Sequence, residues 1–273
     1  MFEEFAPRKR DVNAPKAPSL LQGLFVTLTL PEILVLFSAS GYQSMIPLMR
    51  DPVSISVRAL GLVELVLRGA LFIDENKIVR CTGAYVPTDD LHEEICATIK
   101  KSKRAWTADK WLLALNGETI NPVYIKYHIK HARKRLGKML IKKKLFKKPL
   151  SKKEELLRLF APSKSLDGPL TDEVAKKGSR AEIIAEVSRF LLENTAYQEP
   201  ASLKMSAIVC AFSYCCIIED VLLTMPLKPS EAAKKKVAEI TARFQRELGS
   251  PESTTDWSVL CVLRGYLKLA SWV

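Results

Sequence analysis

The residues of this chain that are best suited to chemistry are cations, and they are concentrated in one stretch. From Lys126 to Lys153 the sequence places thirteen Lys or Arg and no acidic residue. The first part of the stretch predicts a helix, because apolar residues recur at spacings of four and three and form one narrow stripe: Ile125, Ile129, Ala132, Leu136 and Met139. Lys126, Lys130 and Arg133 fall together on a flank of this predicted helix. Such a flank favours an anionic ligand.

The rest of the composition limits what that anion could be. The chain has 273 residues and a formal net charge of +12, most of which comes from the basic stretch. A balance of this kind indicates nucleic acid, an anionic membrane face or an acidic partner, and it is silent about the fold. The apolar share of 48% with only 11 glycines favours a helical protein whose length suffices for a full core in a single domain.

The central element that the sequence predicts is a helix over residues 51–68. Asp51 and Pro52 are typical of an N-cap followed by the first helical position, and the helix is apolar on nearly all sides, which predicts a buried location. Glu64 and Arg68 lie four residues apart and can pair. Arg58 has no such local partner. It could bind an anion near the helix N-terminus, or its charged end could reach water from a buried stem.

Amphipathic helices and a short hairpin are predicted around this central helix. Thr29 is expected to cap a helix that runs to Phe37, and strands over 71–78 turn at 74–76. Residues 140–160 fit either a helix or a hairpin. Together these patterns predict a mainly α fold in which central buried helices are surrounded by amphipathic helices, with one or two short β-hairpins. The other expected helices cover 91–101, 108–115, 173–192, 205–223, 230–248 with Ser230 as its cap, and a last one capped by Asp256.

Catalytic chemistry has little support in the sequence, and no enzyme activity or cofactor is expected. His128 and His131 have a spacing that can hold a metal ion, but neighbouring Cys or acidic ligands are lacking and the surrounding cations oppose a bound metal. No metal site is therefore predicted. The six cysteines lack paired metal-ligand spacing, and they are expected to be buried reduced thiols.

Membrane and nucleic-acid surfaces are the two remaining readings of the basic stretch. A nucleic-acid or general polyanion binder would use residues 123–153, but this segment has few aromatic side chains for stacking. Near an anionic leaflet each Lys or Arg contributes about 1 kcal/mol, so the stretch could hold the protein at a membrane. Apolar segments of the chain are too short or too interrupted to span it. We therefore expect a soluble protein that contacts membranes from outside, and we keep the polyanion binder as the alternative.

Several sequence blocks resemble the Golgi phosphoprotein 3 family. The similarity extends from about Leu21 to the C-terminus, and the blocks occur in the family's order and spacing. They are Leu28–Leu36, Val57–Leu60, Glu64–Gly69, Asn116–Pro122 and Tyr127–Leu136.

The resemblance implies a function and a set of site residues. It implies binding of phosphatidylinositol 4-phosphate on the cytosolic face of Golgi membranes, by an adaptor that links the cytosolic tails of glycosyltransferases to coatomer. Arg58, Lys130 and Arg133 match the residues that read the lipid head group. Met49 stands where the family has a tryptophan that lines the pocket. Methionine keeps the apolar volume but loses the aromatic ring. Either head-group affinity is weaker as a result, or the Lys-rich segment supplies the membrane contact instead.

Two further basic groups are interpreted in the same way. The first should add general attraction to the membrane surface, and its members are Lys142, Lys143, Lys144, Lys147 and Lys148. The second is the cluster Arg8–Lys9–Arg10, which could contact coatomer. Residues 1–20 are expected to be a disordered basic tail and residues 21–273 a single lipid-binding domain. Self-association is left open.

Overall fold

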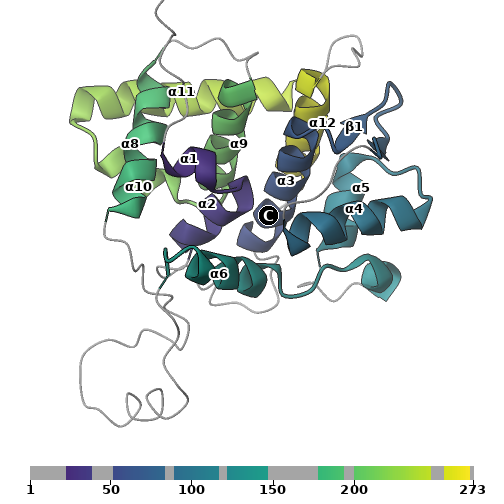
Figure 1. Cartoon of the computed structure of the whole chain (residues 1–273). Coiled ribbons are helices and arrows are strands. Elements are labelled where there is room, and N and C mark those ends of the chain that lie inside the picture. Colours follow the sequence, from purple (N-terminus) through teal and green to yellow (C-terminus); the bar gives the residue numbers. More distant parts are fainter. Residues whose placement is uncertain are drawn as a thin grey trace, which may run out of the picture.

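The computed structural model describes residues 23–38, 52–83, 89–116, 122–146, 178–193, 200–246 and 255–270. The described residues confirm the mainly α fold with a short hairpin (Figure 1). The predicted tail over 1–20, Met49 and the segment 147–160 lie outside these residues. The division into a tail and one domain stays a prediction.

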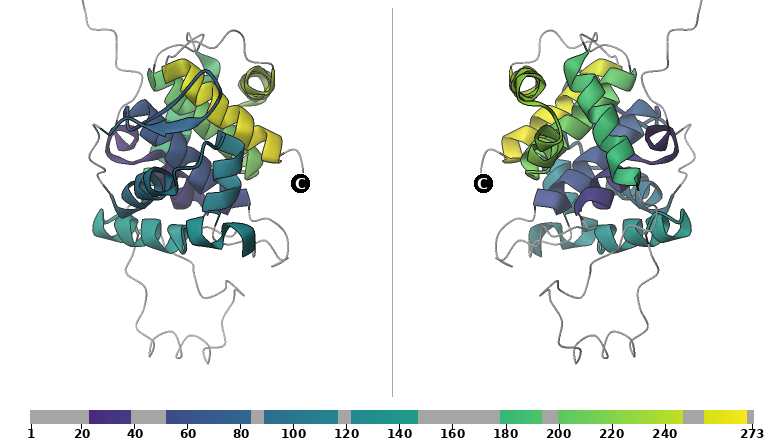
Figure 2. Two further views of the ribbon diagram at one scale, coloured as in Figure 1. Left: turned by 90° about the vertical axis from the view of Figure 1, so that its right-hand side faces the viewer. Right: turned by 90° about the vertical axis from the view of Figure 1, so that its left-hand side faces the viewer.

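Helix α3 (Pro52–Leu67) is the centre of the fold. Every residue from Val53 to Val66 is buried, as its uniformly apolar sequence predicts. It is enclosed by α2 (Leu30–Ser38), α9 (Pro200–Tyr214) and α12 (Thr255–Ala270), and it also touches α4 (Asp90–Ser102), α5 (Ala108–Leu115) and α6 (Ala132–Lys142). Figure 2 shows α6 along one edge of this assembly, below α2 and α3.

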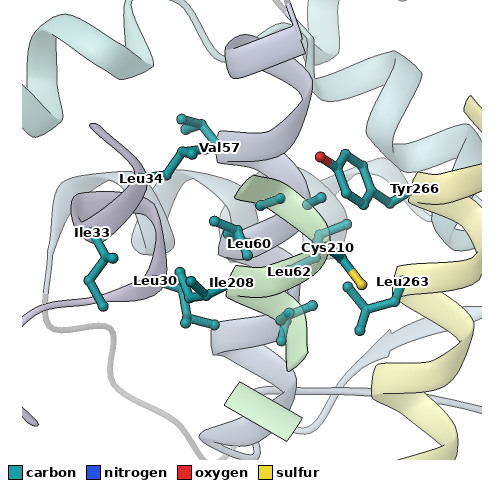
Figure 3. Close-up of a cluster of buried hydrophobic side chains, with 14 of the residues drawn as sticks. Leu30, Ile33, Leu34, Val57, Leu60, Leu62, Ile208, Cys210, Leu263 and Tyr266 are labelled. Atoms are coloured by element: carbon teal, nitrogen blue, oxygen red, sulfur yellow. The ribbon is translucent and has the colours of Figure 1, made fainter. Parts of the chain in front are cut away.

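The core is formed where α2, α3, α9 and α12 meet (Figure 3). Leu30, Leu60 and Ile208 come from three of these helices, and each is at most 1% exposed. Complete burial of such a side chain contributes about 1.5–3 kcal/mol. Tyr266 of α12 lies in the same core, and its hydroxyl group is hydrogen-bonded to Ser56 of α3. This polar pair satisfies two groups that are otherwise costly to bury.

The remaining elements cover the flanks of the core. The predicted hairpin is present, with β1 (Leu71–Ile73) paired to β2 (Val79–Cys81) in antiparallel register, but β2 lies beyond the predicted range of 71–78. Asp74 accepts a hydrogen bond from the backbone of Ile78 across the turn. The described helices over 90–102 and 108–115 also match their predictions. The other elements on the flanks are α1 (Leu24–Thr27), α8 (Ser179–Leu192), α10 (Ile218–Leu223) and α11 (Leu227–Gln245).

Helix α2 begins with the cap that the sequence predicts. The backbone N–H of Glu32 donates to the hydroxyl group of Thr29, and the backbone N–H of Thr29 donates to the Glu32 carboxylate at 2.8 Å. This reciprocal capping box satisfies two N–H groups that the helix itself leaves without partners. Glu32 is nevertheless only 2% exposed, so its carboxylate needs the further partners described below.

The single buried helix predicted over 205–223 is wrong, because the structure divides it into α9 and α10. The chain turns at Cys216, whose φ is +56°. The N–H of Ile217 donates to the carbonyl of Phe212, and the N–H of Cys216 donates to that of Ser213. This pattern is a Schellman motif, which usually has glycine at the left-handed position. Cysteine at that position gives no stop signal in the sequence.

Two predicted helix caps are also wrong. Helix α11 begins at Leu227 and includes Ser230, because Pro229 falls in the first turn, where its missing N–H leaves no hydrogen bond unmade. Helix α12 begins at Thr255, so that Asp256 lies in the first turn rather than before it. There an acidic residue still interacts favourably with the positive end of the helix.

The largest correction concerns the basic stretch, which is not one continuous helix. Residues Pro122–Tyr127 form a 3₁₀ helix, η1, and α6 begins only at Ala132. Ile129 lies between them in a bridge with Asn116. Ile125, expected on the buried stripe, is 62% exposed. Lys126, Lys130 and Arg133 therefore do not share one helix flank.

In the part of the chain that the structure describes, no helix combines the length and apolar character that crossing a bilayer would require.

Candidate functional site

Arg58 is fully buried, which excludes the interpretation that its charged end reaches water. Its guanidinium group donates to backbone carbonyls on three segments. Nη1 donates to the carbonyl and the hydroxyl group of Ser54, at 2.9 and 2.6 Å. Nη2 donates to the carbonyl of Ile129 at 2.7 Å, and Nε to that of Leu115 at 3.3 Å. One side chain of the central helix thus holds the end of α5 and the approach to α6.

The two segments held by Arg58 also bind each other. The N–H of Ile129 donates to the carbonyl of Leu115 at 3.1 Å, beside the parallel bridge between Asn116 and Ile129. Ser54 donates through its hydroxyl group to the side-chain oxygen of Asn116 at 2.7 Å. Both backbone polar groups of Ile129 therefore find partners outside a helix. This explains why the predicted helix is interrupted here although the sequence contains neither glycine nor proline at this point.

Lys130 follows the anchored Ile129 directly, and α6 begins two residues later. Lys130 is exposed, and Arg133 is half-buried in the first turn of α6. His131, the N-cap residue, has a φ of +56° and makes no side-chain capping bond. The N-terminus of α6 is thus positively polarised, uncapped by its own N-cap side chain and flanked by two cations. Together, Lys130, Arg133 and this helix N-terminus define the candidate anion site.

The structure places the three predicted reader residues in one neighbourhood but gives them different roles. Arg58 lies beneath the site, where Nε, Nη1 and Nη2 are all committed to protein acceptors. Lys130 and Arg133 lie at the start of α6, where an anion could approach. The hydrogen-bonding nitrogens of Arg58 thus hold the backbone next to the candidate site, whereas Lys130 and Arg133 lie at its surface. Met49, the fourth predicted member, lies outside the described residues.

His128 reports the positive potential at the site. Burial, followed by the charges of Lys130 and Arg58, lowers the pKa of His128 below its usual 6.5. The folded chain therefore favours neutral His128, and the unfolded chain takes up the proton first as the pH falls. We expect the stabilisation to be complete above about pH 6.5 and to decline below it.

Urea denaturation between pH 7.5 and 5 tests this expectation. The decline in stability should be shallower in His128→Gln, while His131→Gln, which changes an exposed histidine, should retain the wild-type slope. Equal slopes for wild type and His128→Gln would contradict the assignment.

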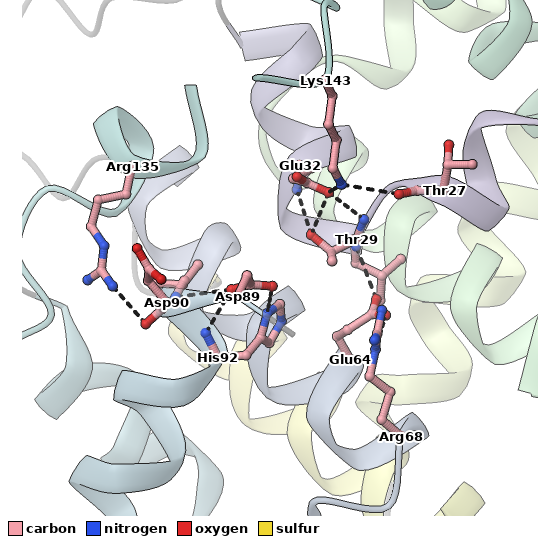
Figure 4. A network of polar contacts seen from close by, with 12 residues as sticks. Thr27, Thr29, Glu32, Glu64, Arg68, Asp89, Asp90, His92, Arg135 and Lys143 are labelled. Atoms are coloured by element: carbon pink, nitrogen blue, oxygen red, sulfur yellow. Dashed lines mark hydrogen bonds and ion pairs between the residues drawn. The ribbon is translucent and has the colours of Figure 1, made fainter. Parts of the chain in front are cut away.

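The lysines predicted to attract the membrane surface are not equivalent. Lys142 and Lys144 are exposed, whereas Lys143 forms an ion pair with the buried Glu32 at 2.7 Å and donates to the carbonyl of Thr27 at 3.1 Å (Figure 4). Lys143 therefore joins the end of α6 to the start of α2, and less of its charge is available to a membrane. Lys147 and Lys148 lie outside the described residues.

Residues 140–160 are predicted to form either a helix or a hairpin, and the structure describes the first part of this segment. The helix continues to Lys142, and Lys144 adopts a φ of +59°. The N–H of Leu145 donates to the carbonyl of Leu140, and both side chains are buried. A second Schellman motif without glycine thus ends the helix. The remainder of the question concerns residues beyond 146, outside the described part.

Sequence reasoning missed the residues that support the site. Ser54 and Asn116 are at most 2% exposed and connect Arg58 to the α5 end. A signal for Ser54 was present, because a polar residue four positions before an arginine on an otherwise apolar helix predicts a buried hydrogen bond. Leu115 and Ile129 contribute only backbone carbonyls. Because the bonds are made by the backbone, the identity of these two side chains gives no signal of this role.

The cysteines have the character of structural thiols, with one exception. Burial raises the pKa of Cys210 to about 12 and that of Cys261 to about 11. Such groups are poor nucleophiles at neutral pH. Cys216 is exposed, which contradicts the prediction of uniformly buried thiols, and Cys81 and Cys96 are half-buried. Among the described residues, His, Cys, Asp and Glu form no group of three or more that could hold a metal ion.

Comparison with known proteins identifies the family. The model of the Golgi phosphoprotein 3 family matches residues 30–255. The chain is 22% identical to vacuolar protein sorting-associated protein 74 of Eremothecium gossypii over 241 residues, which is 81% of this chain and 69% of that protein. It is 23% identical over 235 residues to the protein of the same name in Schizosaccharomyces pombe, covering 80% of this chain and 67% of the relative. The chain belongs to the Golgi phosphoprotein 3 family. This membership supports a Golgi-associated adaptor role.

Proposed function

We propose that this protein is a peripheral adaptor that binds phosphatidylinositol 4-phosphate on the cytosolic face of Golgi membranes. In this proposal Lys130 and Arg133 contact the 4-phosphate at the N-terminus of α6. Arg58 holds that N-terminus in place from below, and Met49 lines the site. The protein has no catalytic activity. It retains glycosyltransferases by their cytosolic tails and connects them to coatomer, with Arg8–Lys9–Arg10 as the coatomer contact.

The observation that carries this proposal is the bond from Arg58 to the carbonyl of Ile129 at 2.7 Å. It fixes the residue directly before Lys130 to a central helix that is buried from Val53 to Val66, so the first turn of α6 is presented on a rigid support. A phosphate monoester suits such a place, because it accepts several charge-assisted hydrogen bonds at once. A diffuse polyanion binder would have no need for one preorganised helix N-terminus. Family membership independently supports the adaptor role at the Golgi.

Vesicle flotation tests the proposal. Wild type should bind vesicles that contain phosphatidylinositol 4-phosphate more tightly than vesicles in which phosphatidylserine supplies the same total charge. We expect Lys130→Ala with Arg133→Ala to weaken binding to the 4-phosphate vesicles about 100-fold. Each lost contact to a charged group removes at least about 1.5 kcal/mol, and 1.4 kcal/mol is a factor of ten.

The matched control removes two positive charges from the same helix without touching the site. Lys138 and Lys142 are both exposed on α6 and lie beyond its first turn. Lys138→Ala with Lys142→Ala should reduce binding to both vesicle types by a similar, smaller factor. If the two double variants behave alike, binding is governed by charge alone and the specific site is refuted. Tight binding to RNA with a steep salt dependence and without a lipid preference would favour the polyanion alternative.

A further inference from the structure

The 3₁₀ helix η1 presents an apolar surface next to the candidate site. Val123 is 72% exposed and Ile125 is 62% exposed, whereas a helix of this fold ordinarily directs such side chains to the core. Lys126, the next residue, is exposed as well. Three residues after Lys126 the chain reaches Ile129, which Arg58 anchors. The exposed apolar pair is therefore held at a short and fixed separation along the chain from Lys130.

A cluster of aromatic rings supports η1 from below. Trp106 lies 5.7 Å from Tyr124 and 5.0 Å from Tyr127, measured between ring centroids, and it also contacts Trp111 of α5 at 5.0 Å. Trp106 and Tyr124 are half-buried, so part of each ring is at the surface. The contacts of Trp106 with the two tyrosines are edge-to-face and fix these rings relative to one another. The exposed apolar pair thus stands on a rigid base.

Cations accompany the aromatic rings. The Arg104 guanidinium carbon lies 5.8 Å from the centroid of the Trp106 ring, and Lys126 Nζ lies 5.0 Å from that of Tyr127. Both residues are exposed. Both charges are therefore accessible to an anion near η1. In Figures 1 and 2, η1 and α6 lie along the same edge of the molecule.

We propose that η1 is a second membrane contact, in which Val123 and Ile125 enter the acyl boundary of an anionic bilayer. Trp106 and Tyr124 lie at head-group level, and Arg104 and Lys126 face lipid phosphates. An apolar tip, amphipathic rings and cations, in that order of depth, are what a membrane interface binds. A protein partner would not require the cations Arg104 and Lys126 beside the apolar tip. This inference rests on the proposed function, because it adds an inserted apolar contact to the membrane face that the candidate anion site already defines.

Replacing the apolar pair tests this contact. We expect Val123→Ser with Ile125→Ser to bind 4-phosphate vesicles about 100-fold more weakly than wild type, about tenfold for each side chain withdrawn from lipid. Affinity for a soluble short-chain phosphatidylinositol 4-phosphate, which offers no bilayer, should stay unchanged. Leu223→Ser with Leu227→Ser is the matched control, because these leucines are 82% and 77% exposed on α10 and α11. This control should bind vesicles like wild type.

A depth measurement makes the test direct. Ile125→Trp should keep vesicle binding, and its added fluorescence should be quenched by lipids brominated in the acyl chains, whereas the fluorescence added by Leu223→Trp should not.

Wild-type-like vesicle binding by the serine variant overturns the contact at η1 even if the Lys130 and Arg133 variant has lost binding. A change from dimer to monomer with unchanged vesicle binding would instead assign η1 to self-association. If wild type binds neither the vesicles nor the soluble lipid, the proposed function itself is refuted.

Discussion

Replacing Arg58 with methionine is expected to lower the free energy of unfolding by about 3–5 kcal/mol. Methionine retains much of the side-chain volume but leaves the carbonyls of Ser54, Leu115 and Ile129 without the donors that they have in the folded chain. Each buried acceptor left unsatisfied costs about 1–3 kcal/mol. Urea denaturation followed by far-UV circular dichroism measures the difference. A domain of ordinary stability would lose a large share of its margin.

A surface arginine provides the control for this substitution. The side chain of Arg80 is about half exposed, and it pairs with Asp74 at 3.1 Å across the hairpin turn. Arg80→Met should change the unfolding free energy by less than about 1 kcal/mol. If Arg58→Met folds as stably as wild type and loses only lipid binding, Arg58 contacts the lipid directly and our positioning role is wrong. Because we expect the opposite, substitutions of Arg58 cannot separate binding from folding.

Glu32→Ala is the second substitution for which we expect a large loss, about 2–4 kcal/mol of unfolding free energy. The Glu32 carboxylate accepts from the N–H of Thr29 at 2.8 Å and from Nζ of Lys143 at 2.7 Å, in a place with almost no contact with water. Alanine removes the carboxylate half of the capping box and the link between α2 and the end of α6 together, while the Thr29 hydroxyl group can still accept from the backbone N–H of residue 32. Urea or thermal denaturation measures the loss.

Two comparisons separate the cap from the link. Glu94→Ala removes a carboxylate that is 40% exposed and pairs with Arg135, so the cost should stay below about 1 kcal/mol. Lys143→Met breaks the link but keeps the cap, and it should fall between the two. Were Glu32→Ala no worse than Glu94→Ala, the buried carboxylate would contribute nothing beyond an ordinary surface pair.

The fold could be predicted largely because its strongest signals are local. The helix from Val53 to Val66 is apolar on nearly all sides, and such a helix is stable in a folded protein only when it is buried. The Thr29 and Glu32 pair is likewise local, because the two residues are only three positions apart. The Glu64–Arg68 ion pair, at 2.7 Å, follows from helical spacing alone. Where neighbours in sequence decide the conformation, a pattern is sufficient.

The errors occur where distant backbone atoms decide the conformation. The interruption at Ile129 depends on the carbonyl of Leu115 and on the guanidinium group of Arg58, which lie in other elements. Cys216 and Lys144 occupy left-handed positions that usually hold glycine. Tertiary contacts outweigh local preference at these points. For the site, the resemblance brought Arg58, Lys130 and Arg133 together, but sequence alone could not show which of them is buried.

The bonds made by Arg58 also bear on the order of events during folding. They join positions separated by 57 and 71 residues along the chain, so they form only after long loops have closed. A nascent chain that has emerged only as far as α5 would expose the apolar helix α3 before Lys130 and the first turn of α6 have been made. If the protein has the function proposed above, newly made chains acquire membrane affinity late, in one step with the closure of the core. The connectivity of the fold would then limit premature attachment of incomplete chains to membranes.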